Sequence, residues 1–160
     1  MQTLVAGLLW FSAIACGLMA GLYFAFSAFV MAALGRVDQA AGIAVMNAIN
    51  KVIVQSLFLP VFMGSTLTCL SLAVLATFRW HEPGASLWLA GGGVYLFGMF
   101  AVTMLFNLPL NKAPAAVQPA SDEAGKLWAR YLSDWTWWNH MRTIASTLAF
   151  VLFIGAIAAR

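Results

Sequence analysis

The densest group of chemically versatile side chains lies in nine residues, from Trp135 to Thr143, directly before the last apolar run. The stretch reads WTWWNHMRT and holds three indole rings, an amide, an imidazole and a guanidinium. His140 is a candidate functional residue, because it lies beside several amides, whereas a lone histidine at an interface is usually structural. Arg142 adds a cation close to it in the sequence. We therefore predict that this segment forms one wall of a small-molecule site.

Amide side chains occur in pairs beside two other apolar runs. Asn47 and Asn50 lie just before the second run, and Asn107 and Asn111 lie at the end of the third. Residues three or four apart share one face of a helix, so each pair can present its amides together. Asn107 and Asn111 could contribute to a site or could satisfy backbone groups that Pro109 leaves unpaired.

Four uncharged runs must position these groups, and they make up most of the chain. The sequence is 63% hydrophobic and 8% charged, whereas a soluble domain carries about a quarter charged residues. Three runs exceed the roughly 20 residues needed to cross a bilayer, and the last reaches that length only by including Asn139, His140 and Arg142. The sequence therefore predicts an all-α fold, an integral membrane four-helix bundle, in which residues 1–160 form a single domain. The runs are 1–35, 52–78, 85–111 and 143–159.

We expect membrane helices near residues 3–34, 53–78, 86–108 and 138–159, with short interfacial helices near 40–50 and 122–133. Pro60 is expected to kink the second membrane helix. Pro109 is expected to loosen or end the third, because it removes a backbone donor and disfavours helix at the residue before it.

Four spans place the first and third loops at the same membrane face, so the amides, His140 and Arg142 converge there. Tyr23 and Ser27 lie in the half of the first helix nearest that face. The predicted catalytic residues are His140, Arg142, Asn107 and Asn111, and the predicted substrate-binding residues are Asn47, Asn50, Tyr23, Ser27, Trp135, Trp138 and Asn139.

The distribution of positive charge predicts an orientation in the membrane. Six Lys and Arg side chains fall on the side of loops one and three, and two, Arg79 and Arg160, fall on the other. The positive-inside rule then places loops one and three in the cytoplasm and both termini outside. We expect a bacterial inner membrane.

The sequence lacks the residues that several classes of function require. The Lys and Arg residues form no basic run, which argues against a nucleic-acid partner. The two histidines are predicted on opposite faces and no carboxylate lies within a run, so a closed zinc site is not furnished. No cofactor is predicted, although haem held by His140 as a single axial ligand stays open. Cys16 and Cys69 lie in separate apolar runs and indicate no disulfide framework.

Four motifs in the same order resemble the anthrone-oxygenase-like family of small four-helix membrane proteins. They are GLYFAFS at 21–27, MNAIN at 46–50, NLPLN at 107–111, and Trp135 followed by WNHMRT at 138–143. Together they extend over almost the whole chain. The family motif has a proline after the position of Met31, where this chain has Ala32, and the difference bears on the geometry of the helix end.

The resemblance implies an activity, since fungal members oxidise anthrones to anthraquinones with no established cofactor. His140 would remove a proton from the enolisable carbon, and Arg142, Asn107 or Asn111 would stabilise the enolate oxygen. Tyr23 and the tryptophans would hold the flat ring system by stacking. The implied partners are a small hydrophobic aromatic molecule, dioxygen and the lipid bilayer.

Three other functions could use the same residues. A non-catalytic small-molecule or lipid-binding membrane protein would fill the cavity without turnover. A haem or metal redox protein would use His140 as a ligand. A transporter is disfavoured, because proton-coupled carriers need an ionisable group inside a span and these spans are uncharged.

Overall fold

The apolar runs form long helices, and a computed structural model of the chain describes residues 2–112 and 122–160. Within these residues the chain consists of helices joined by short turns, with no strand. Four helical stretches are long and apolar enough to cross a membrane: Gln2–Leu34, Phe58–Phe78, Ala85–Lys112 and Ala124–Ala158. The predicted fold class, an integral membrane four-helix bundle, is confirmed.

Two of the spans are interrupted by wider, π-helical turns. The first span consists of α1 (Gln2–Ala25), η1 (Phe26–Val30) and α2 (Met31–Leu34). The third consists of α5 (Ala85–Tyr95), η2 (Leu96–Ala101), η3 (Thr103–Asn107) and α6 (Leu108–Lys112). The remaining helices are α3 (Gln39–Ile53), which is the predicted helix of the first loop, α4 (Phe58–Phe78), which is the second span, and α7 (Asp122–Ala158).

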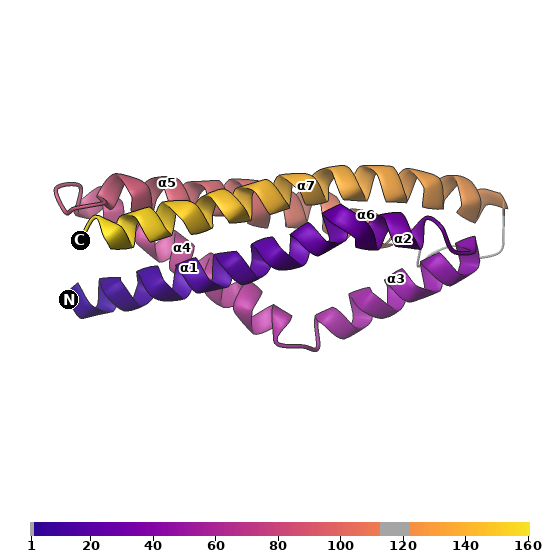
Figure 1. The fold of residues 1–160 in the computed structure, drawn as a ribbon, viewed down its shortest axis with the longest axis horizontal. Coiled ribbons are helices and arrows are strands. Elements are labelled where there is room, and N and C mark those ends of the chain that lie inside the picture. The colour runs from indigo at the N-terminus through magenta and orange to yellow at the C-terminus, as the bar shows by residue number, and fades with distance from the viewer. Residues whose placement is uncertain (1, 113–121) are drawn as a thin grey trace.

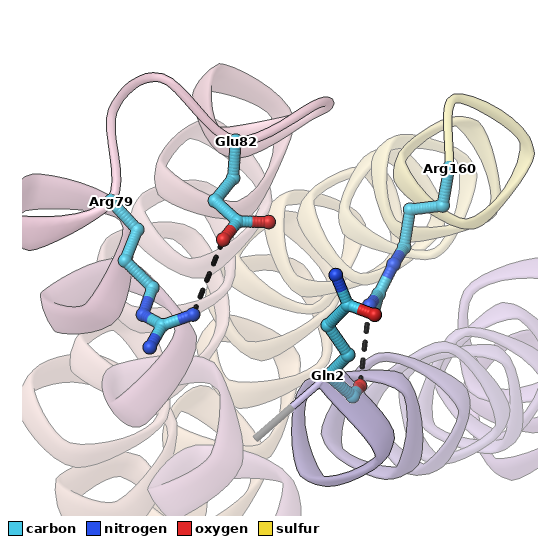
Figure 2. Close-up of polar contacts among 4 residues, drawn as sticks. All are labelled: Gln2, Arg79, Glu82 and Arg160. Atoms are coloured by element: carbon cyan, nitrogen blue, oxygen red, sulfur yellow. Dashed lines mark hydrogen bonds and ion pairs between the residues drawn. The ribbon is translucent and has the colours of Figure 1, made fainter.

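The helices form an elongated bundle with α7 running along its whole length (Figure 1). Both termini lie at one end, and α3 and α4 diverge from the turn that joins them, so that α3 covers the half of the molecule far from the termini. At the end with the termini, Arg160 Nη2 donates to the Gln2 carbonyl at 3.2 Å and Arg79 pairs with Glu82 at 3.3 Å (Figure 2).

One stripe of α7 faces the rest of the bundle, with a buried residue every three or four positions. This spacing keeps side chains on one face of a helix. The stripe joins two apolar clusters, one around Trp128, Tyr131 and Trp135 and the other around Ala149 and Phe153. The buried polar residues of α7 between these clusters are Asn139, Arg142 and Ser146.

The structure corrects three expectations about helix ends. The predicted helix at 122–133 and the fourth span are one continuous helix, because residues 134–137 contain neither glycine nor proline. Pro60 is the third residue of α4 and not an interior one, so its missing N–H has no intrahelical acceptor to lose. The third span continues past Pro109 to Lys112, and the π-helical turns before it can accommodate the freed backbone groups.

Candidate functional site

A cavity of about 170 Å³ lies where α1, α3, η3 and α7 meet. The start of α4 closes it through Phe58. Because the 21 residues of α4 span about 31 Å, close to the thickness of the bilayer core, the cavity lies near one membrane boundary. Its wall is mostly apolar, and its polar or amphipathic side chains are Tyr23, Asn50, Thr103, Asn107, Asn111, Trp135 and Arg142.

Arg142 provides the positive charge of the cavity wall and is 5% exposed. Its guanidinium carbon lies 4.4 Å from the ring centre of Tyr23 and 4.9 Å from that of Trp135. Arg142 Nη2 donates to Asn139 Oδ1 at 2.7 Å, whereas Nε has no hydrogen-bond partner. The two rings and one amide therefore hold the guanidinium in place and leave part of its donor capacity free.

No carboxylate neutralises Arg142 among the side chains that the structure describes. The ion pairs found there join Arg79 to Glu82 and Arg130 to Asp134. Moving an unpaired cation out of water costs several kcal/mol even after relaxation, at an order-of-magnitude level. An anionic ligand in the cavity would offset that cost.

Asn139 fixes Arg142 against α1 and is itself fully buried. Its Nδ2 donates to the Tyr23 carbonyl and to Ser27 Oγ, each at 2.7 Å. Ser27 also lies 3.1 Å from Thr143 Oγ1. The structure thus places two predicted substrate-binding residues, Asn139 and Ser27, outside the cavity wall, where they join α7 to α1 and position the guanidinium.

The two amides of the third span differ in their hydrogen bonding. Asn107 Nδ2 donates to the Trp135 carbonyl at 3.2 Å, which leaves Asn107 Oδ1 buried without a partner. Asn111 Oδ1 accepts from Trp135 Nε1 at 2.8 Å and from the Tyr131 hydroxyl at 2.9 Å. Asn107 therefore offers a free acceptor, and Asn111 has its oxygen committed to the protein.

Two π-helical turns contribute residues to the cavity wall. The turn η1 begins at Phe26, and η3 contains Thr103 and Asn107. A π-helical turn changes the direction in which the following side chains point, and such turns are frequent at functional sites. The local backbone geometry thus supports this cavity as the candidate site.

His140 lies outside the cavity, although it was predicted to share a site with Arg142. It is half-buried in a shallow depression on another face of α7, beside Ser27 and Trp137. The reason is helical geometry: two residues along an α-helix correspond to a rotation of about 200°, so His140 and Arg142 point in opposite directions.

Two further predicted contacts are absent from the cavity wall. Trp138 stacks on Phe106 with ring centres 3.7 Å apart and an angle of 6° between the ring planes. Asn47 is half-buried on α3, and Asn50 is the amide of that helix that reaches the cavity.

Tyr131 and the apolar cavity residues of α3 were not among the predicted site residues. Tyr131 supports the site through its hydrogen bond to Asn111. The spacing of Trp128, Tyr131 and Trp135 was the signal: extended to Asn139, it marks one face of a single helix with steps of three or four residues. Treating residues 122–133 and 138–159 as separate helices concealed that pattern.

The fold and the cavity define a small helical membrane protein with an apolar cavity whose wall includes a buried guanidinium. A family model described as anthrone oxygenase matches residues 57–152, more than half of the sequence, so the chain belongs to the anthrone oxygenase family. This membership supports an oxygenase-type function. The match includes Asn107, Asn111, Trp135 and Arg142, while the contributions of α1 and α3 to the cavity lie before it. Searches of curated proteins and of solved structures returned no match.

Proposed function

We propose that this protein is a membrane oxygenase that converts an enolisable polycyclic aromatic ketone of the anthrone type to a quinone. The observation that carries the proposal is Arg142, a buried guanidinium without a carboxylate partner among the described side chains, in the wall of an apolar cavity. The enolate of such a ketone combines a single negative charge with a flat apolar body, so it complements both features of the cavity.

Binding would place the enolate oxygen against Arg142. Charge-assisted hydrogen bonds are about twice as strong as neutral ones, so the guanidinium favours the enolate over the parent ketone. The free Oδ1 of Asn107 can accept a hydrogen bond from a ring hydroxyl. The aromatic wall formed by Tyr23, Phe26 and Trp135 suits a ring system.

The proposed reaction consumes one dioxygen for each quinone formed. The activated methylene group of the ketone first loses a proton, and its electron pair moves into the enolate that Arg142 stabilises. The enolate carbon then reduces dioxygen, and a proton converts the product to a carbon-bound hydroperoxide. Loss of water breaks the O–O bond and the remaining C–H bond, so the methylene carbon becomes a carbonyl that retains one oxygen atom.

The cavity geometry favours a substrate that loses its proton to water at the membrane boundary and binds as the anion. The cavity wall contains neither a histidine nor a carboxylate. The general-base role predicted for His140 would require the imidazole to reach the cavity from its separate depression. It stays a prediction that a single variant can test.

Isotope labelling provides a direct test in lipid nanodiscs. Anthrone is supplied under ¹⁸O₂, and the rate of quinone formation, oxygen uptake and the mass of the quinone are recorded. We expect one labelled oxygen per quinone, equal consumption of dioxygen and substrate, and a rate well above that of Arg142→Met protein, which corrects for spontaneous oxidation.

Two other outcomes would contradict the proposal. Arg142-dependent ligand binding with no excess turnover would favour the non-catalytic binding protein. A haem absorption spectrum of the purified protein that changes in His140→Gln would favour the redox protein with His140 as ligand.

We also propose that loops one and three face the cytoplasm of a bacterium and that both termini lie outside. The positive-inside rule counts the Lys and Arg side chains on each side of the membrane. Arg142 is left out of the count because it is buried in the bundle. Five cationic side chains then remain on the side of loops one and three, and two, Arg79 and Arg160, lie on the other side. Labelling of single cysteines introduced at Gln55 and Glu82 with a membrane-impermeant reagent, in a variant without the native cysteines, tests this orientation in intact cells. Labelling at Gln55 from outside would contradict it.

A further inference from the structure

A second hollow adjoins the cavity on the outer surface of the bundle. This groove of about 500 Å³ lies between α1 and the C-terminal part of α3 and reaches the turn before α4. It shares Leu22, Phe26, Ile49 and Ile53 with the cavity wall. All four side chains are only partly buried, so they form the boundary between the cavity and the outer surface.

The size of the cavity shows why this boundary matters. An apolar protein cavity of about 150 Å³ holds a single benzene ring, and sites for larger organic molecules usually measure about 300–1,000 Å³. The cavity alone, at about 170 Å³, is of the one-ring size. A three-ring ketone with its oxygen at Arg142 must therefore extend beyond the cavity.

The groove is apolar and faces away from the bundle. Its remaining wall includes Val45 and Val52, which are 47% and 62% exposed, together with Ala48. Beside it, Leu57 in the turn before α4 is 82% exposed. So much exposed apolar surface beside a membrane span is suited to lipid rather than water. A hydrophobic molecule dissolved in the bilayer could reach the cavity from this side.

We propose that the cavity and the groove form one binding site that opens sideways to the bilayer between α1 and α3. The charged oxygen of the ligand lies at Arg142, one ring fills the cavity, and the remaining rings pass between Phe26 and Ile49 into the groove. The ligand class rests on the proposed function, whereas the shape of the site rests on the shared wall. Ile49 and Ile53 thereby determine how many rings the site accepts.

Two probes of different length test this arrangement by binding alone. Para-nitrophenol has one ring, 1,8-dihydroxyanthraquinone has three, and both carry an acidic hydroxyl for Arg142. Binding to protein in nanodiscs is measured by absorbance titration and corrected for partitioning into lipid with Arg142→Met protein. The test variants are Ala48→Trp and Val52→Trp, which add a ring within the groove, because both residues line the groove and neither lines the cavity. Val74→Trp serves as the matched control, because Val74 is 47% exposed on α4 and borders neither hollow.

We expect Ala48→Trp to weaken binding of the three-ring probe by about tenfold or more, which corresponds to about 1.4 kcal/mol. Binding of para-nitrophenol should change by less than about twofold, which corresponds to less than about 0.4 kcal/mol. Val74→Trp should bind both probes as the parent does. If Ala48→Trp does not give a monodisperse protein, Val52→Trp decides the question.

Equal effects on the two probes, or no effect on either, would overturn the proposal of a site that extends into the groove. The absence of Arg142-dependent binding of both probes to the parent protein would overturn it as well. Selective loss of the three-ring probe in a protein without oxygenase turnover would support the extended site and refute the proposed function, so the two failures can be told apart.

Discussion

Replacing Arg142 with methionine should separate the function of this residue from the stability of the fold. If the guanidinium served only packing or hydrogen bonding, its removal would greatly lower the stability of the fold. If the guanidinium serves to bind an anion, its burial without a partner costs free energy in the unliganded protein, and its removal eliminates that cost. Arg142→Met keeps an unbranched side chain against the rings of Tyr23 and Trp135 and removes the charge.

The contacts in the structure allow an estimate of the change in stability. The hydrogen bond from Nη2 to Asn139 contributes about 1.5–3 kcal/mol, because its donor is charged. The contacts with the Tyr23 and Trp135 rings contribute about 0.5–2 kcal/mol each. Relief of an unpaired buried charge returns several kcal/mol, at an order-of-magnitude level. We expect these contributions to offset each other, leaving the stability within about 2 kcal/mol of the parent.

The loss of activity should be much larger. Removing one donor from an oxyanion site typically lowers kcat by about 10²–10³-fold. Arg142 supplies the positive charge of the cavity wall, so we expect a reduction of at least about 10²-fold in kcat/KM for anthrone. Arg142→Lys should fall between the two proteins, because it keeps the charge and loses the planar array of donors.

The assay combines quinone formation and oxygen uptake in nanodiscs with thermal unfolding of the same samples. Arg130→Met is the matched control, since Arg130 lies on the same helix and its side chain is 81% exposed in its pair with Asp134. It should match the parent in both measurements. A folded Arg142→Met protein with undiminished turnover would refute the reasoning, and so would a protein too unstable to purify.

Three further predictions, the last with a control variant, test the packing and the site. Asn139→Leu should lower stability by about 3 kcal/mol, because it removes three hydrogen bonds that join α1, α7 and Arg142; unfolding that matches the parent would contradict the role assigned to this amide. His140→Gln should change kcat/KM by less than about threefold, whereas a loss of about 10²-fold would restore the imidazole as general base. Gly98→Ala should lower stability by about 1–3 kcal/mol, because its new Cβ would lie 2.5 Å from the Ala145 Cβ. Gly93→Ala, with nothing within 4 Å, should not be destabilised, and equal thermal shifts in the two glycine variants would count against this packing.

The sequence by itself determined the class of structure. Crossing a bilayer requires about 20 apolar residues with their backbone groups paired, so four uncharged runs could only become four helices. The order of the amides, tryptophans and Arg142 along the chain was also sufficient for the family. These features depend on local composition and on short motifs, which can be recognised in the sequence without knowledge of how the helices pack.

Only the tertiary structure decided which polar side chains share a site. Asn139, His140 and Arg142 are neighbours in sequence, yet one fixes α7 to α1, one lies in a separate depression and one faces the cavity. A helix turns by about 100° per residue, so neighbours in sequence point in different directions. Which direction faces the interior depends on α7 being continuous through residues 134–137 and on the π-helical turns of the spans packed beside it. A separate α3 then adds Asn50, Ile49 and the lateral groove, which follow from how distant helices pack together.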